Sequence, residues 1–141
     1  MNYYFNKTVK MSFEDAEIKV IEALKSEGFG VLTEIDVQAT LKKKLNVDFR
    51  RYKILGACNP PFAYKALQAE DKIGLLLPCN IVIQEKSDKT IEVAAINPLA
   101  SMEVVGNEKL TEIAKEVQSK LNNVTWVFGI YIQLIIVLIQ F

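Results

Sequence analysis

The chain has 141 residues, half of them hydrophobic, which is enough for one domain with a core of its own. Seventeen basic and seventeen acidic side chains cancel to a net charge of zero, which makes bulk electrostatic attraction to nucleic acid or to an anionic membrane unexpected. Histidine is absent, and this excludes Ser-His-Asp and Cys-His catalysis as well as histidine-rich zinc sites.

Alternating strands and helices are predicted for the first half of the chain. Residues 3–11 alternate in polarity as a strand does, and the capping-box spacing that starts at Ser12 opens a helix that stops at Gly28. Residues 29–37 form the second predicted strand, and one face of it is expected to carry Phe29, Val31, Thr33, Ile35 and Val37. Asp36 is placed to cap a short amphipathic helix that follows.

In the second half of the chain, residues 52–58 are predicted to form a short strand. Asn59 before a proline is typical of a helix start, with asparagine at the N-cap and proline at the first helical position. Residues 73–86 and 90–96 are expected to form long strands joined by a three-residue hairpin turn. A last helix is predicted at about residues 107–122, where apolar side chains recur at helical spacing.

Pro78 interrupts the first of the two long strands, so a bulge or an edge position is expected there. The order of the predicted elements is strand, helix, strand, helix, strand, helix, two strands and a helix. This order predicts an α+β domain in which helices pack on a largely antiparallel sheet.

Several segments in order, Gly28–Val37, Ala39–Lys42, Leu55–Pro60 and Gly74–Asn80, resemble the family known as domain of unknown function 302. The resemblance covers about residues 3–124. It implies a curved, largely antiparallel sheet with helices on one face, similar to one repeat of the TATA-binding protein: strand, helix, four strands and helix, with short inserted helices. A homodimer is also expected. The resemblance brings no activity with it, and a fold shared with a DNA-binding protein is no evidence for DNA binding.

Residues 1–124 are predicted to form the single α+β domain, whereas residues 125–141 form an uncharged apolar tail that departs from the family pattern. As a helix the tail would span about 25 Å, at the short limit for a hydrocarbon core of about 30 Å. The alternatives are a membrane anchor, a segment docked on the domain or on a second copy, and a non-native extension. The chain start lacks a signal-peptide pattern, so a cytoplasmic location is expected, with membrane association through the tail as an option.

The two cysteines, Cys58 and Cys79, each stand before an asparagine at the end of an apolar run. Cys58 directly precedes a predicted helix start, where partial positive charge would favour a reactive thiolate, with Cys79 as its resolving partner. A metal site built from both thiolates and completed by Glu34, Asp36 or a second copy is a weaker alternative, because the cysteine spacing matches neither CxxC nor a standard zinc motif. Buried structural cysteines are the simplest interpretation.

Charged side chains supply a second set of candidates. Glu34 and Asp36 share one face of a predicted strand and could act as acid and base or bind a cation, or else serve as a solvated residue and a helix cap. Lys42, Arg51 and Tyr52 belong to a basic stretch that could hold a phosphate or a carboxylate, although such runs are usually solvated faces.

Two functions from different classes remain. The first is a cytosolic, homodimeric binding module for a small ligand, with anions among the candidates, whose site residues would be Glu34, Asp36, Lys42, Arg51, Tyr52, Asn59 and Asn80. The second is a thiol-based redox or metal-binding protein that uses Cys58 and Cys79. No complete catalytic constellation and no cofactor motif is visible, so the sequence leaves open whether the protein is an enzyme.

Overall fold

The computed structural model describes the backbone of residues 2–139 and the side chains of residues 2–125. Five strands form one antiparallel sheet in the order β1-β5-β4-β3-β2. The strands are β1 (Tyr4–Val9), β2 (Gly30–Asp36), β3 (Tyr52–Cys58), β4 (Cys79–Glu85) and β5 (Ile91–Ile96). The helices are α1 (Phe13–Ser26), α2 (Val37–Leu45), α3 (Pro60–Ala69), α4 (Pro98–Met102) and α5 (Glu108–Ile139), with short 3₁₀ turns η1 (Ile73–Leu76) and η2 (Glu103–Val105). The predicted α+β class is confirmed.

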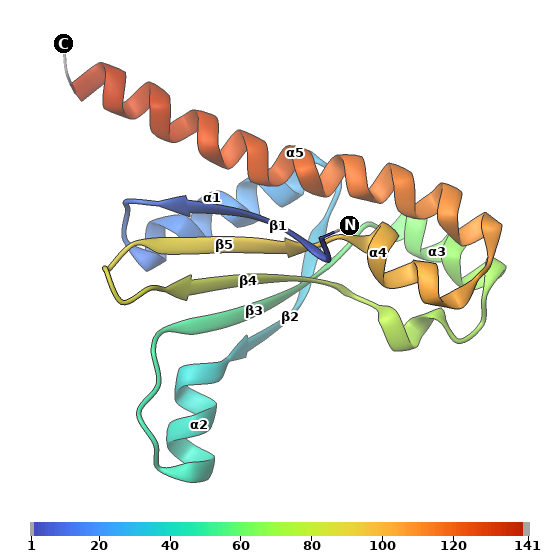
Figure 1. Ribbon diagram of the computed structural model, residues 1–141, viewed down its shortest axis with the longest axis horizontal. Helices are drawn as coiled ribbons and strands as arrows, with labels where there is room; N and C mark the ends of the chain where they lie inside the picture. The colour runs from blue at the N-terminus through green and yellow to red at the C-terminus, as the bar shows by residue number, and fades with distance from the viewer. Residues whose placement is uncertain (1, 140–141) are drawn as a thin grey trace.

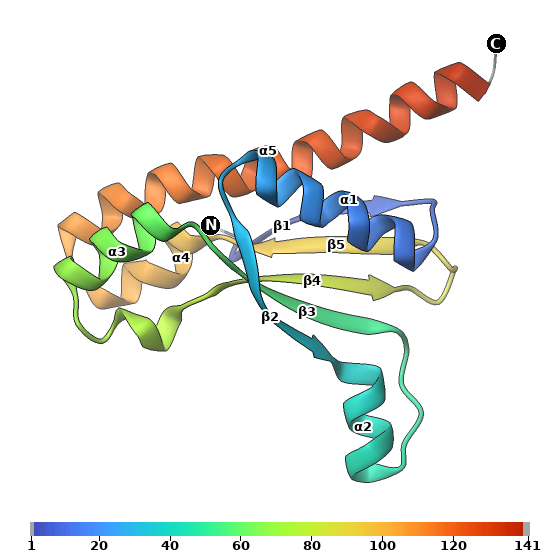
Figure 2. The ribbon, with the colours of Figure 1, turned by 180° about the vertical axis from the view of Figure 1, so that it is seen from behind.

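Helices cover one face of the sheet. In both views α1 and α5 lie on the same side, α3 and α4 lie beyond one end of the strands, and α2 lies beyond the other end (Figures 1 and 2). The core forms where α1 and α5 meet the sheet, and its buried side chains include Val20, Leu24, Leu55, Ile81, Ile83, Val93 and Leu121. Within the described part of the chain, no helix covers the opposite face, which is called the open face below.

The limits of α1 follow the sequence signals. The Ser12 Oγ accepts a hydrogen bond from the Asp15 amide at 3.1 Å, which satisfies one of the free donors of the first turn. At the other end Gly28 has φ +83°, and the Phe29 amide donates to the Leu24 carbonyl at 2.9 Å. This is the Schellman arrangement, which favours glycine because left-handed backbone costs it little.

The prediction of one long strand over residues 73–86 is wrong for its first part. Residues 73–76 form η1 instead, and β4 begins only at Cys79, directly after Pro78. Proline has no amide hydrogen to give to a neighbouring strand, so the strand starts after it rather than running through it. β4 is the middle strand of the sheet, and the predicted bulge or edge position at Pro78 is therefore also wrong.

The hairpin between β4 and β5 matches its prediction. The Lys86 amide donates to the Thr90 carbonyl at 2.8 Å, and the Lys89 amide donates to the Lys86 carbonyl at 2.9 Å. Lys89 has φ +69°, as the last residue of a three-residue hairpin loop usually does.

A bulge breaks the alternation of β2. Val31 pairs with Ala57 and Glu34 pairs with Leu55, so the register shifts by one residue between Val31 and Thr33. Thr33 and Ile35 consequently face the open side rather than the core. The predicted single face from Phe29 to Val37 is wrong, because an extra residue in one strand moves every later side chain to the other face.

The last helix is longer than predicted. Leu110, Ala114, Val117 and Leu121 are buried as expected, but α5 continues without a break to Ile139. The side chains from residue 126 onward and residues 140–141 lie outside the description, so the alternatives for the tail remain predictions. Among the described residues, no helix is both long and apolar enough to cross a bilayer.

Candidate functional site

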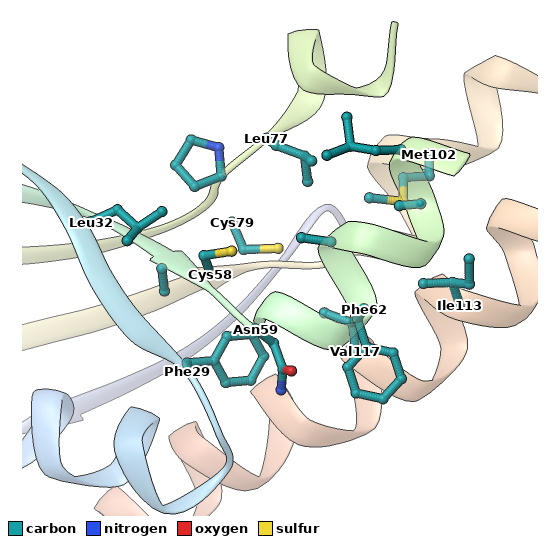
Figure 3. A pocket seen from close by; sticks show the side chains of 15 residues that line it. Phe29, Leu32, Cys58, Asn59, Phe62, Leu77, Cys79, Met102, Ile113 and Val117 are labelled. Carbon is teal, nitrogen blue, oxygen red and sulfur yellow. The ribbon is translucent and has the colours of Figure 1, made fainter. Parts of the chain in front are cut away.

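A pocket of about 290 Å³ opens at the end of the sheet where β3 runs into α3. Its walls come from the start of β2, the end of β3, the segment before β4, and helices α3, α4 and α5 (Figure 3). Both cysteines line the pocket, together with apolar side chains that include Phe29, Leu32, Phe62, Leu77, Met102, Ile113 and Val117. Asn59 is the one polar residue among the described lining residues.

Local sequence explains why the pocket forms at this place. β3 ends at Cys58, and two prolines at the start of α3 turn the chain into a helix that cannot continue the strand. Pro78 delays the start of β4 in the same way on the neighbouring strand. The helix α3 therefore stands away from the strand ends, and its small inward residues Ala63 and Ala66 leave the space unfilled.

The two thiols differ in exposure. Cys79 is 8 % exposed and stands opposite Ala57 in the β3–β4 register, whereas the neighbouring Cys58 is half-buried. Burial raises the pKa of the Cys79 thiol to about 11, and the nearby Cys58 contributes to the rise. Figure 3 shows both sulfur atoms on the same wall of the pocket. Cys79 is therefore a protonated thiol at neutral pH.

Asn59 occupies the predicted N-cap position of α3, but its side chain makes no capping hydrogen bond. Its Nδ2 instead donates to the Glu27 carbonyl at 3.1 Å, and the residue is 8 % exposed. This bond ties the β3–α3 junction to the end of α1. Asn59 is thus a structural link beside the pocket.

The predicted acidic pair is engaged in other contacts. Glu34 binds the Lys53 Nζ at 2.7 Å, and Glu17 from α1 binds the same ammonium group at 3.0 Å. Burial alone would lower the pKa of Lys53, but the bonds to Glu34 and Glu17 outweigh it and raise the pKa. Asp36 caps α2, since its Oδ1 accepts from the Ala39 amide at 2.9 Å. The capping alternative for Asp36 is confirmed.

The predicted basic candidates also lie away from the pocket. Lys42 pairs with the exposed Asp48 at 3.1 Å, and Arg51 pairs with Glu14 at 2.6 Å while its guanidinium stacks over the Phe13 ring. Arg51 stands at the opposite end of β3 from Cys58, about 23 Å along the strand. Neither Lys42 nor Arg51 lines the pocket that holds the two cysteines.

Tyr52 and Asn80 lie on the opposite face of the sheet from the helices. Both line a shallow hollow of about 400 Å³ on the open face, together with Tyr4, Val82 and Glu92. Asn80 pairs with Gly56 in the regular part of β4.

No group of three or more cysteine, aspartate or glutamate side chains converges on a metal-binding point among the described residues. Phe62 and Ile113 line the pocket although they were not among the predicted site residues, because apolar side chains on a helix usually belong to the core. The sequence carries one signal for the pocket: α3 has the small residues Ala63 and Ala66 on the side that lines it.

The fold and the site define a small α+β protein with an antiparallel sheet open on one face and an apolar pocket at one sheet end. The family model described as "Domain of unknown function DUF302" matches residues 5–125, and the chain belongs to this family. The chain is 32 % identical over 94 residues to an uncharacterized protein of Aquifex aeolicus (strain VF5), which covers 67 % of this chain and 59 % of that protein.

A solved structure shows the same fold. It is the crystal structure of an uncharacterized conserved protein DUF302 from Bacillus stearothermophilus, with a TM-score of 0.82 and 27 % sequence identity. The match covers 89 % of this chain and 97 % of that one. The resemblance inferred from the sequence is confirmed.

Proposed function

We propose that this protein is a cytosolic binding module for a small, predominantly apolar molecule that occupies the pocket beside Cys58 and Cys79. The observation that carries the proposal is the pocket itself: about 290 Å³ in volume and walled almost entirely by carbon and sulfur. Cavities that bind small molecules are mostly apolar and begin at about this size.

The pocket favours an apolar ligand over the anion considered from the sequence. The basic side chains that would bind an anion are paired with carboxylates elsewhere. An anion that left water for these apolar walls would lose its hydration without a compensating partner. An apolar molecule gains free energy from the same transfer, at about 25 cal/mol for each Å² removed from water.

Filling the pocket should abolish ligand binding. Ala63 lines the pocket from α3, so the phenyl ring of Ala63→Phe would occupy the space where the ligand is expected. We expect the affinity for the environment-sensitive apolar fluorophore 1-aminoanthracene to fall by at least about tenfold. Fluorescence titration of the full-length chain measures this affinity. Native mass spectrometry of freshly purified protein detects any ligand that co-purifies.

The matched control adds the same ring to the outside of the same helix. Gln68 is exposed on α3 and does not line the pocket, so Gln68→Phe should leave binding unchanged. If both variants bind the fluorophore as the unmodified chain does, the pocket is not the binding site and the proposal is wrong.

The second candidate function is thiol chemistry, favoured by the presence of both cysteines on one pocket wall. Cys58 is the more exposed of the two thiols and lies two residues before the start of α3, at the mouth of the pocket. Cys79 would act as the resolving thiol. Arg51, a basic residue that could assist a thiol, lies at the other end of β3, so this candidate rests on the exposure of Cys58 and on the shared pocket wall alone.

The thiols should react in a fixed order. In the native full-length chain, iodoacetamide should label Cys58 at neutral pH and leave Cys79 unlabelled. The thiolate is the reactive form, so labelling of Cys79 should speed up about tenfold per pH unit until the pH reaches its pKa of about 11. Peptide mass spectrometry across a pH series measures both sites.

In Cys58→Ser the slow labelling of Cys79 should persist, since burial is the main cause of its raised pKa. Equal labelling of the two cysteines at neutral pH, or an inert Cys58, would remove the support for thiol chemistry.

A further inference from the structure

The open face of the sheet carries a continuous band of apolar side chains across four adjacent strands. The register pairs Ala94 with Val82, Val82 with Ile54, and Ile54 with Ile35. These four residues, called the apolar row below, lie opposite the side that α1 and α5 cover. Ile35 is 47 % exposed. A solvated sheet face is normally polar, so a band of this kind indicates a surface that is covered in the functional state.

The helix α2 points to the same conclusion. It has nine residues and none of them is buried. Leu45 at its end is 65 % exposed and Val47 just beyond it is 43 % exposed. A helix this short is marginal in water unless it packs against something. In both views α2 lies on the side of the sheet away from α1 and α5, at the margin of the open face (Figures 1 and 2).

We propose that the open face, together with α2, is the interface of a homodimer formed by two copies of this chain. The size of the open face supports a second folded chain as the partner. Five strands about 4.8 Å apart and about 20 Å long give a face of about 400 Å² in projection, and side-chain relief and α2 add to it. The sheet face alone is about half of the roughly 800 Å² that each partner buries in a standard interface, and α2 with its exposed Leu45 extends it.

The apolar row is also complementary to itself. A two-fold axis parallel to the strands, midway between β3 and β4, sets Ala94 of one copy against Ile35 of the partner subunit. The same axis sets Val82 against Ile54 of the partner subunit. The small Ala94 then faces the larger Ile35, and the two β-branched side chains Val82 and Ile54 face each other, which allows two aligned sheets to pack closely.

Charge on this face argues against other partners. Arg50, Lys86 and Glu92 border it, so both signs are present, and Glu92 accepts from Gln84 at 2.8 Å and lies 3.9 Å from the Lys86 ammonium. Nucleic acid or an anionic membrane would require a surplus of positive charge, and the whole chain has a net charge of zero.

The test is the mass of the full-length chain in solution. Sedimentation velocity or light scattering after gel filtration should show a dimer. Ile35→Lys and Leu45→Lys should each raise the dimer dissociation constant by about 100-fold or more, because an unpaired ammonium would be buried in the interface. Leu45→Lys alters only the exposed side of α2, so it reports on the dimer even if Ile35→Lys does not fold.

The matched control is Val104→Lys, which places the same charge at an 83 % exposed apolar residue in η2, away from the open face. It should leave the dimer intact. The proposal is overturned by a monomeric unmodified chain, by a dimer that survives both interface variants, or by equal dissociation in the control. A monomer that binds phosphatidylcholine vesicles and loses binding in Ile35→Lys would overturn it too, and assign the face to lipid.

Discussion

Gly56→Ala should lower the free energy of unfolding by about 3 kcal/mol or more. A Cβ atom at this position would lie 2.6 Å from the Pro78 Cγ and would also collide with the Thr33 hydroxyl. Thr33 can rotate away, but the proline ring cannot. β3 is bonded to a strand on each side, so its backbone has no room to retreat. The midpoint of urea-induced unfolding measures the loss.

Gly30→Ala is the matched control for this substitution. Gly30 also lies in a strand and has no atom within 4 Å of the position that a Cβ would take. It should unfold at the same urea concentration as the unmodified chain or slightly higher, because alanine reduces the freedom of the unfolded state. Similar losses in both variants would show that the strands, rather than the contact with Pro78, disfavour any side chain.

Asn97→Ala should cost about 2–4 kcal/mol of stability. Asn97 is 3 % exposed, and its Nδ2 donates to the Asn2 carbonyl at 3.0 Å. Its Oδ1 accepts from the Leu99 amide and from the Gln118 Nε2, both at 3.2 Å. One buried side chain therefore connects the start of the chain, the first turn of α4 and the middle of α5, and alanine leaves all three groups without a partner.

Asn123→Ala removes an equivalent side chain from the exposed surface of α5 and should change stability by less than about 0.5 kcal/mol. Thermal and urea unfolding followed by circular dichroism compare the two variants. A loss below about 1 kcal/mol for Asn97→Ala would mean that water replaces these hydrogen bonds readily.

Much of the fold could be predicted because its local signals agree with its packing. The Ser12 cap, the Gly28 stop and the hairpin after β4 each depend on a few adjacent residues. The predictions fail where contacts with residues far away in the sequence determine the local structure. The pairing of β2 with β3 places the bulge, and no property of Leu32 alone reveals it.

One helix was missed although its signal was present. Asn97 is followed by proline, the same pair that indicated α3 at Asn59, and α4 begins there. The two asparagines differ in what they bond. Asn97 accepts from the Leu99 amide as a cap should, whereas Asn59 gives its amide to Glu27. The spacing predicts the helix start, but tertiary contacts decide what the side chain does.

The candidate site was predicted in part. The two cysteines and Asn59 line one pocket, whereas Asn80 faces the hollow on the open side of the sheet. The charged candidates do not join them. Lys53 attracts Glu34, and Glu14 attracts Arg51, so opposite charges near one end of β3 neutralise each other instead of forming a pocket. Sequence showed the charges but not which of them were neighbours.

The bulge in β2 has a consequence for how the sheet could change. Leu32 is the additional residue, and deleting it would restore strict alternation. Thr33 already pairs with Gly56 and Glu34 with Leu55, so every later side chain would keep its present face, with Ile35 on the open side and Glu34 on the helix side. Loss of Leu32 would therefore remove one side chain from the pocket wall and the local kink of β2, while the rest of the β2–β3 register stayed as it is.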